Sequence, residues 1–274
     1  MPAGASPDPR FEAAVALAVR SGQMLMRYFE GARVAWKDDD SMVTDADLAI
    51  EDFLTREIGA AFPEDVVLGE ERPRGEPVPA GRHVWVIDPV DGTNNFGRGI
   101  PGFSVSIGVL RDGLPVAGVV HDPLARQLFS GCLGRGAWLN GRALQVEIAA
   151  LGPRSLFSIR APYAGGVPPF VSRWLERYRL RRPGSTALAL CYVAAGALAF
   201  AHDHRASLWD VAGAAAVLRE AGGLLTDSSG RDLFPLAPGA IGRQPLSFLA
   251  GNPIAHHESL ADMVDTEREA THGL

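Results

Sequence analysis

The chain has 274 residues, of which 47% are hydrophobic and 21% are charged, and its formal net charge is −6. This length and composition are typical of a globular protein with a sizeable core, arranged as one large domain or two smaller ones. The negative charge argues against general nucleic-acid binding, and no long block of Lys or Arg offsets it. The two cysteines, Cys132 and Cys191, form no Cys-x-x-Cys pair, so a zinc–thiolate site or redox motif has no support. Two free thiols fit a reducing cytoplasm.

No segment reads as an export signal or a membrane span. The first ten residues lack the basic region followed by an apolar one that a secretory signal needs. The longest apolar stretch, residues 187–201, is too short to cross a bilayer and reads as a core helix. We therefore expect a cytoplasmic protein with no membrane partner.

Apolar residues recur at helical spacing in two N-terminal segments, which predicts helices over residues 11–29 and 44–62. An extended segment at 34–36 and a charged turn at 37–40 separate them. A short strand at 66–68 follows, and then a loop at 72–82 that is rich in Pro, Gly and charge.

The rest of the chain mixes strands and helices. Alternating apolar residues between turn signals predict antiparallel strands at 103–110, 116–121 and 127–131. Beyond them we expect strands near 155–159 and 246–250, helices at 169–177, 185–200 and 208–221, and a polar helical tail. Helices and mostly antiparallel strands in separate runs predict an α+β fold.

Residues 83–96 carry the most functional information. An apolar run of strand type ends in Asp88, and Asp91, Gly92 and Thr93 follow within five residues. Buried carboxylates must be paired or bound to a cation, and such oxygens are ligands that Mg²⁺ prefers. A plain alternative exists, because Asp-Gly and Asp-Pro are common in surface turns. This stretch alone leaves both interpretations open.

Four more acidic residues lie where predicted elements begin or end. Glu70 follows a short strand and could belong to a solvated turn. Asp47 and Asp210 each stand third after a Thr or Ser, a spacing that also fits a capping box at a helix start. Asp203 lies between two histidines after an apolar stretch, where an ordinary polar loop is the alternative. Singly each alternative is reasonable; together they require many acids to be incidental.

These segments resemble the signatures of the inositol monophosphatase family. Residues 85–96 look like its first signature and residues 209–223 like its second, while 43–47 and 69–71 match two shorter blocks. Order and spacing agree over about residues 11–260. The resemblance implies a Mg²⁺-dependent phosphate monoester hydrolase that often forms a homodimer.

The fold that the resemblance implies is a layered α/β/α/β/α sandwich of the inositol monophosphatase and fructose-1,6-bisphosphatase type. A single domain would span residues 1–274. Its first half, to about residue 150, would bind the metal. The second half would carry Asp210 and the substrate pocket.

The resemblance also implies two to three Mg²⁺ ions. Glu70, Asp88 and the backbone carbonyl of Val90 would hold the first ion. The second would be held by Asp88, Asp91 and Asp210. A third, weaker ion would involve Glu70 again. In this scheme no covalent enzyme intermediate forms.

Other residues would act on the water and the substrate. Thr93 and Asp47 would form a hydrogen-bonded pair that, with Glu70, orients and activates the attacking water. The backbone N–H groups of Gly92 and Thr93 would bind phosphate. The sugar side of the pocket would be lined by four residues: Asp203, Gly184, Ser185 and Thr186.

Inositol 1-phosphate is the substrate we expect. Asp203 favours a polyol, although it is one methylene shorter than the Glu typical of inositol monophosphatases. The run 100–108 also looks like those enzymes. Segments 43–47 and 67–71 look similar to histidinol phosphatases as well, but Asn94 replaces a Lys often found in them. Histidinol phosphate, fructose 1,6-bisphosphate and phosphoadenosine phosphate remain alternatives.

A function of another class is a regulatory binding protein that retains the fold, since some bacterial relatives act in transcription complexes. A decayed enzyme should have lost a metal ligand or the catalytic hydroxyl. Here all five key residues are present: Glu70, Asp88, Asp91, Thr93 and Asp210. This completeness favours the enzyme.

Overall fold

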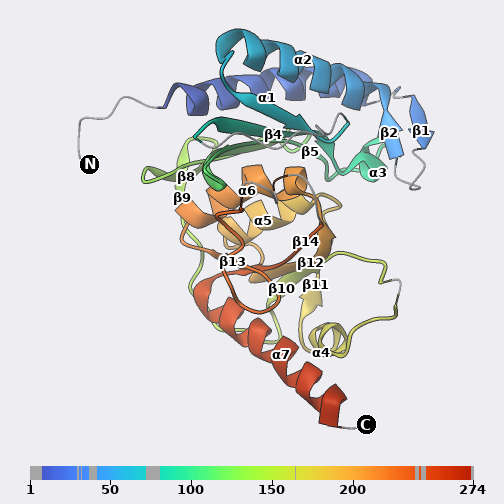
Figure 1. The fold of residues 1–274 in the computed structure, drawn as a ribbon. Coiled ribbons are helices and arrows are strands. Elements are labelled where there is room, and N and C mark those ends of the chain that lie inside the picture. Colours follow the sequence, from blue (N-terminus) through green and yellow to red (C-terminus); the bar gives the residue numbers. More distant parts are fainter. Residues whose placement is uncertain are drawn as a thin grey trace.

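The computed structural model describes residues 8–29, 31, 33–36, 42–71, 81–163, 165–237, 241 and 245–272. Two helices, a sheet, two helices, a second sheet and two helices lie on one another in that order (Figure 1). The expected α+β sandwich with α/β/α/β/α layers is therefore confirmed. The predicted turn at 37–40 and most of the predicted loop at 72–82 lie outside the described residues.

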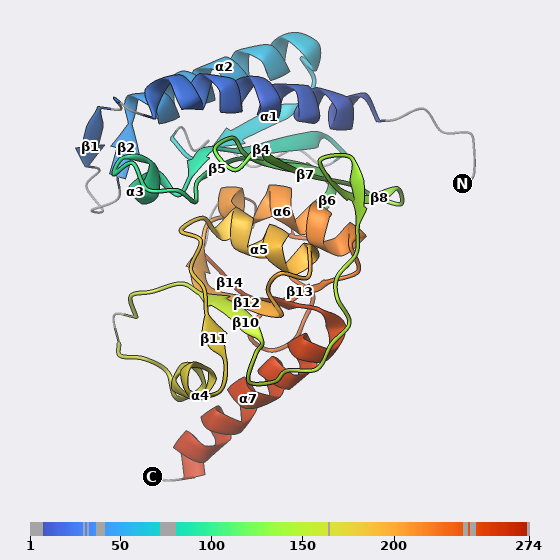
Figure 2. The ribbon, with the colours of Figure 1, turned by 180° about the vertical axis from the view of Figure 1, so that it is seen from behind.

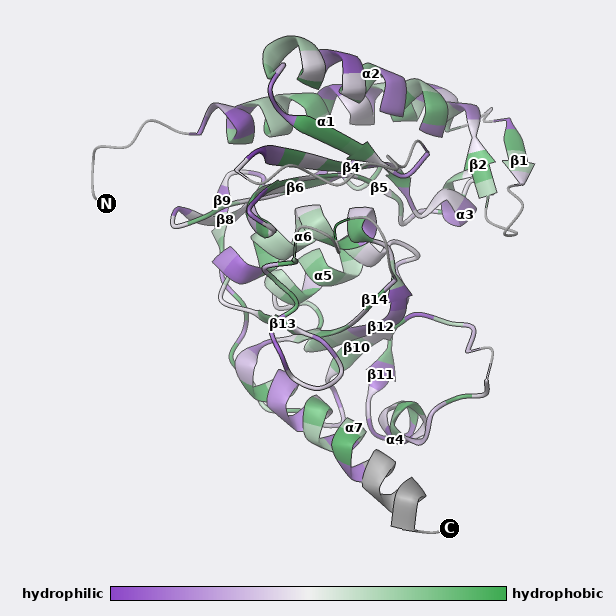
Figure 3. Ribbon diagram, in the orientation of Figure 1, coloured by the Kyte–Doolittle hydropathy of each residue, from purple (hydrophilic) through white to green (hydrophobic). Residues whose placement is uncertain are grey.

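The first outer layer consists of α1 (Pro9–Tyr28) and α2 (Asp45–Ala61), which cover one face of the first sheet (Figure 2). Between them β1 (Val34–Trp36) and β2 (Met42–Thr44) pair antiparallel. Most buried residues of both helices are apolar, and apolar and polar residues alternate along each helix in the hydropathy colouring (Figure 3).

The first sheet has seven strands in the order β3-β4-β5-β6-β7-β8-β9. Only β3 and β4 are parallel; every other neighbouring pair is antiparallel. The strands are β3 (Val66–Gly69), β4 (His83–Asp91), β5 (Ser104–Arg111), β6 (Leu114–Asp122), β7 (Gln127–Cys132), β8 (Gly136–Leu139) and β9 (Arg142–Leu144). The short helix α3 (Thr93–Phe96) directly follows β4.

The middle layer consists of α5 (Thr186–Ala194) and α6 (Leu208–Glu220), which lie between the two sheets. Every residue of α6 from Val211 to Leu218 is buried. A helix that is covered on both sides must be apolar all round, and this explains why both helices are rich in Ala.

Three glycines in adjacent strands let α6 lie directly on the first sheet. Gly108 of β5 is paired with Gly118 of β6, and Gly118 is paired with Gly131 of β7. A Cβ atom on Gly108 or Gly131 would lie 2.7 Å from a backbone atom of α6, closer than real contacts allow. This row of three glycines therefore sets the distance between the sheet and the helix that carries Asp210.

The second sheet has the strand order β11-β10-β12-β14-β13. Its strands are β10 (Leu156–Ile159), β11 (Arg179–Leu180), β12 (Phe200–Ala206), β13 (Leu224–Thr226) and β14 (Leu246–Gly251). On its far face α4 (Pro169–Arg177) and α7 (Pro253–His272) form the last layer. No helix in the described part of the chain has both the length and the apolar character needed to cross a membrane.

One predicted helix is wrong over its second half. The sequence predicts a helix over 185–200, but α5 ends at Ala194 and Phe200 already begins β12. Gly196 adopts a φ of 72°, the left-handed conformation that terminates helices. As a result Asp203 lies on a strand that is paired with β14, not in a loop.

Candidate functional site

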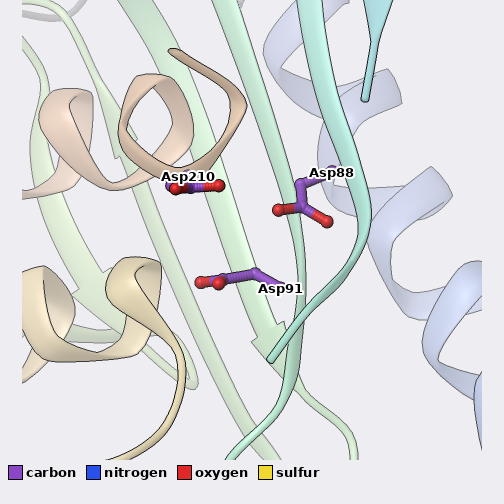
Figure 4. Close-up of side chains that lie close together, drawn as sticks. All are labelled: Asp88, Asp91 and Asp210. Carbon is purple, nitrogen blue, oxygen red and sulfur yellow. The ribbon is translucent and has the colours of Figure 1, made fainter. Parts of the chain in front are cut away.

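Three aspartates converge where the first sheet meets the middle layer. Asp88 and Asp91 lie in the last four residues of β4, and Asp210 lies in the first turn of α6. One carboxylate oxygen of each lies within 4.8 Å of the others, and the three side chains face one another (Figure 4). Their exposed fractions are only 1%, 7% and 9%. Buried carboxylates with this spacing provide the oxygen ligands that hard divalent cations require.

The electrostatics of this cluster call for a cation. Burial raises the pKa of Asp88 well above its usual range, and the charges of Glu70, Asp91 and Asp210 raise it further. Burial and the Asp91 charge also raise the pKa of Asp210 well above its usual range. A divalent cation among the three carboxylates would reverse this effect and favour their ionised forms.

Asp91 joins β4 to the start of α5. Its Oδ2 accepts hydrogen bonds from the Ser185 hydroxyl at 2.5 Å and from the Ala187 N–H at 2.6 Å. The Thr186 N–H reaches Oδ1 at 3.3 Å. Burial raises the pKa of Asp91, while these hydrogen bonds lower it in part. The N-terminal end of α5 thus stabilises a carboxylate that also faces the cluster.

Thr93 and Asp47 form a polar pair next to the cluster. The Thr93 hydroxyl lies 2.8 Å from the carbonyl oxygen of Val90 and 3.4 Å from Oδ1 of Asp47. Asp47 is fully buried, and burial raises its pKa to about 6 even though Thr44 donates hydrogen bonds to its other oxygen. The capping box predicted as an alternative for Asp47 therefore exists, and the same carboxylate still faces Thr93.

The same holds for Asp210, whose Oδ2 accepts the N–H of Ser207 at 2.9 Å. A capping box and a place in the acidic cluster are compatible because a carboxylate has two oxygens, each with free lone pairs. The capping box is therefore present at both Asp47 and Asp210, and Asp210 also lies in the acidic cluster.

A cavity of about 430 Å³ opens over the cluster. It is lined by all but one of the residues predicted for the site, namely Glu70, Asp88, Val90, Asp91, Gly92, Thr93, Gly184, Ser185, Thr186, Asp203 and Asp210. The exception is Asp47, which lies behind Thr93 in α2 and does not line the cavity. Gly92 has a φ of 97°, and this allows the chain to turn from β4 into α3.

Asp203 lies on the wall of the cavity formed by the second sheet. Its Oδ1 accepts the Arg205 N–H at 2.9 Å. Its Oδ2 lies 3.2 Å from the Thr186 hydroxyl and 3.4 Å from Nη1 of Arg160. Asp203 is thus within the cavity as predicted, but protein groups already occupy much of its hydrogen-bonding capacity.

Several residues of this cavity were not predicted from the sequence, and Asn95, Arg160 and Arg182 are among them. Arg160 directly follows β10, and its Nη1 lies 3.5 Å from Asp210 as well as close to Asp203. A charged residue at the end of a predicted strand is the sequence signal that points to Arg160. Asn95 lies within residues 85–96, the segment that resembles the first family signature.

Asn95 holds two cavity loops together. Its Nδ2 lies 2.9 Å from the carbonyl oxygen of Pro101, 3.0 Å from that of Gly102 and 3.2 Å from that of Pro183. Pro183 lies just before the segment that donates to Asp91. Asn95 therefore fixes the turn after β4 relative to the start of α5.

Known proteins with the same pattern of sequence and fold were found by comparison. Inositol monophosphatase 1 of Solanum lycopersicum is 36% identical over 230 residues, covering 80% of this chain and 84% of the relative. Nus factor SuhB of Pseudomonas aeruginosa is 34% identical over 239 residues, covering 83% and 88%. The structure of a Thermotoga maritima IMPase superposes with a TM-score of 0.84 at 29% identity, covering 96% of this chain and 99% of that one.

The sequence model described as "Inositol monophosphatase family" matches residues 6–269, nearly the whole chain. Together with the layered fold and the acidic cavity, this match shows that the chain belongs to the inositol monophosphatase family and is a phosphoric monoester hydrolase.

Proposed function

We propose that the protein is a Mg²⁺-dependent inositol monophosphatase that cleaves inositol 1-phosphate by in-line attack of water on phosphorus. One observation carries this proposal. Three buried carboxylates, Asp88, Asp91 and Asp210, meet in one cavity beside the Thr93 hydroxyl. Carboxylates grouped in this way would bind divalent cations, and the bound cations would attract a phosphate. A neutral ligand would not need such a group of negative charges.

The oxygen ligands fit Mg²⁺, because carboxylates and a backbone carbonyl are hard donors. Glu70, Asp88 and the Val90 carbonyl would hold one ion, and Asp88, Asp91 and Asp210 a second. Glu70 would contribute to a third, weaker site. Bound Mg²⁺ would offset the negative charge of the phosphate, acidify a water and stabilise the departing alcohol oxygen.

The chain's own groups orient the reactants. The Thr93 hydroxyl, which contacts Val90 and Asp47, would hydrogen-bond the attacking water, and the buried Asp47 would receive a proton through Thr93. Glu70, which lines the same cavity, would complete the set of groups that position this water. The backbone N–H groups at Gly92 and Thr93 begin α3 and would bind phosphate oxygens.

The leaving alcohol would lie against the wall made by Asp203 and the loop at 184–186. Asp203 can accept hydrogen bonds from ring hydroxyls, and the Thr186 hydroxyl can accept or donate them. Ser185 acts differently, because its hydroxyl donates to Asp91 and so orients a metal ligand. Histidinol phosphate, fructose 1,6-bisphosphate and phosphoadenosine phosphate are the alternative substrates.

The same proposal covers the whole chain. We propose a single domain over residues 1–274 whose site is shared between the two sheets, and a homodimer in the cytoplasm. The buried free thiols of Cys132 and Cys191 support a reducing compartment. Retention of every predicted ligand supports an enzyme over a purely regulatory binding protein. Sedimentation velocity of the purified chain tests the dimer.

Phosphate release from four substrates tests the central proposal. Inositol 1-phosphate, histidinol phosphate, fructose 1,6-bisphosphate and phosphoadenosine phosphate would each be assayed with Mg²⁺ and with excess chelator. We expect Mg²⁺-dependent release, with the largest kcat/KM for inositol 1-phosphate. Release that persists in chelator would refute the metal assignment. A much larger kcat/KM for another substrate would replace inositol 1-phosphate.

A further inference from the structure

The charged residues that line the cavity fall into two groups. Four acids, Glu70, Asp88, Asp91 and Asp210, lie where the proposed cations bind. The other group consists of Asp203 and two arginines, Arg160 and Arg182, on the wall proposed for the leaving alcohol. The second group has one negative and two positive charges. It therefore retains a net positive charge once cations balance the four acids.

Arg160 is held at the boundary between the two groups. It follows the last residue of β10, and its backbone N–H donates to the carbonyl of His202 on β12. Nη1 lies 3.4 Å from Asp203 and 3.5 Å from Asp210. The side chain is 36% exposed and lines the cavity.

The contacts of Arg160 leave most of its donors unused. A guanidinium has five N–H donors in a planar fork. Its two side-chain hydrogen bonds both use Nη1, at 3.4 and 3.5 Å, and share that nitrogen between Asp203 and Asp210. Within the described part of the chain, Nε and Nη2 make no hydrogen bond that would compete with a ligand.

Asp203 has fewer unused hydrogen-bonding positions than Arg160. A carboxylate offers about four acceptor positions. Three protein groups already contact it: the Arg205 N–H, the Thr186 hydroxyl and Arg160 Nη1. The group on this wall with the most unsatisfied hydrogen-bonding capacity is thus a cation and not the carboxylate.

Arg182 adds a second positive charge from the next loop. Its Nη2 donates to the carbonyl oxygen of Ala161, the residue after Arg160, at 3.3 Å. Arg182 therefore contacts the segment that follows Arg160, and both arginines line the cavity. Arg160 shares only Nη1 between Asp203 and Asp210, so a phosphate or carboxylate on the leaving group would accept hydrogen bonds from the remaining donors of its fork.

We propose that Arg160, assisted by Arg182, is a specificity-determining residue that extends the substrate range to phosphate monoesters whose leaving group carries a second anionic group. This inference rests on the proposed phosphatase function. It predicts that such an ester is cleaved with a higher kcat/KM than the same ester without the second anion.

Matched substrate pairs test the inference. Glycerol 2-phosphate and 2-phosphoglycerate differ by one carboxylate in place of a hydroxymethyl group. Fructose 1-phosphate and fructose 1,6-bisphosphate differ by one phosphate. With the full-length protein and Mg²⁺, we expect kcat/KM to be about tenfold or more higher for the member with the second anion, because hydrogen bonds between charged groups are worth more than neutral ones.

Arg160→Met should bring this ratio within about twofold of one, and Arg160→Lys should give an intermediate ratio because a Lys keeps the charge but loses the planar fork. The matched control is Arg205→Met, whose exposed side chain does not line the cavity and whose backbone N–H is retained. It should keep the wild-type ratio. A wild-type ratio near one, or equal losses on both members in Arg160→Met, would overturn the inference.

Binding separates a failure of this inference from a failure of the phosphatase proposal. In a Thr93→Ala background with Mg²⁺, calorimetry should give a Kd for 2-phosphoglycerate about tenfold lower than for glycerol 2-phosphate. The difference should disappear when Arg160→Met is added. Equal Kd values would refute the role of Arg160 whether or not phosphate is released. Absence of phosphate release from every ester would refute only the phosphatase proposal.

Discussion

The Ser185 hydroxyl donates to Oδ2 of Asp91 at 2.5 Å, and this single contact joins two positions 94 residues apart. Ser185 also caps α5, since its oxygen accepts the N–H of Leu188 at 2.9 Å. One hydroxyl thus begins a helix of the middle layer and orients a carboxylate at the end of β4. The stability of α5 and the geometry of the acidic cluster are therefore linked.

Ser185→Ala should weaken both functions of this hydroxyl. We expect the free energy of unfolding to fall by about 1–2 kcal/mol, the usual cost of losing a cap and a hydrogen bond to a charged group. Mg²⁺ should also bind more weakly, because Asp91 loses a partner that orients it. Denaturant titration and Mg²⁺ calorimetry measure the two effects. Ser172→Ala, on the exposed face of α4, is the control, and identical behaviour of the two variants would contradict the link.

Asp88→Asn should abolish turnover while the fold survives. The Asn side-chain oxygen can still accept the N–H of Val90, which Asp88 does at 3.0 Å. Since burial and neighbouring carboxylates raise the pKa of Asp88, removing its charge should not destabilise the metal-free protein. Addition of Mg²⁺ should no longer raise the Tm. An active Asp88→Asn protein, compared with the exposed Asp112→Asn as control, would refute the assignment of the ligands.

Local parts of the site could be predicted because each is encoded in a short segment. The apolar run that forms β4 and its termination at Asp88 both follow from adjacent residues. The end of α5 could not be predicted from apolar periodicity, because the residues on either side of Gly196 are equally apolar. Only the tertiary pairing of β12 with β14 distinguishes a strand from a continuing helix there.

The meeting of Asp210 with Asp88 could be expected from the family resemblance but not from local pattern. Their distance depends on how closely α6 approaches the sheet, and this is set by Gly108, Gly118 and Gly131 on three strands. From the sequence alone, each glycine would be expected only to weaken the strand that contains it. Arg160 was missed for a similar reason, since its partners come from β12 and α6.

Thr93→Ala should lower kcat strongly and leave Mg²⁺ binding largely intact. The Thr93 hydroxyl contacts Val90 and Asp47 but is not among the proposed ligands, so its loss removes the orientation of the water. Positioned proton-transfer groups contribute about 100-fold or more to rate. Thr93→Ser keeps the hydroxyl and should retain most of the activity. If kcat is unchanged in Thr93→Ala, this residue has no part in the mechanism.

Gly118→Ala should push α6 away from the first sheet. The added Cβ would lie within contact distance of the Gly213 carbonyl and of the Ala216 side chain, at 2.9 Å from the latter. Overpacking of this kind costs about 1–3 kcal/mol. Because Asp210 begins the same helix, Mg²⁺ affinity should fall together with stability, which denaturant titration and calorimetry would show.

The control for this variant is Gly59→Ala. Gly59 lies within α2, and a Cβ there meets no atom within 4 Å. This substitution should raise stability by up to about 1 kcal/mol, since Ala favours a helix interior over Gly. If Gly118→Ala is as stable as the wild type, the row of three glycines does not set the position of α6.

His256 should make the fold sensitive to acid. Its Nε2 lies 2.9 Å from the Thr226 hydroxyl, which itself donates to the carbonyl of Asp227. Nε2 therefore carries the proton. The buried Nδ1 has no hydrogen-bond partner among the described residues, so a second proton there would find no acceptor. Burial and the nearby His257 lower the pKa of His256 from 6.5 to about 4.

Between pH 6.5 and about 4 the unfolded chain thus binds more protons at this position than the folded one, so stability falls as the pH falls through this window. After allowance for solvent screening, the loss at pH 5 should be about 1–2 kcal/mol. Denaturant titrations at pH 7.5 and 5.0 measure it, and the difference between the two pH values should be smaller in His256→Gln. His257→Gln removes the neighbouring imidazole but keeps His256, so it should reduce the pH dependence less than His256→Gln does. An equal pH dependence in wild type and His256→Gln would show that the acid sensitivity arises elsewhere.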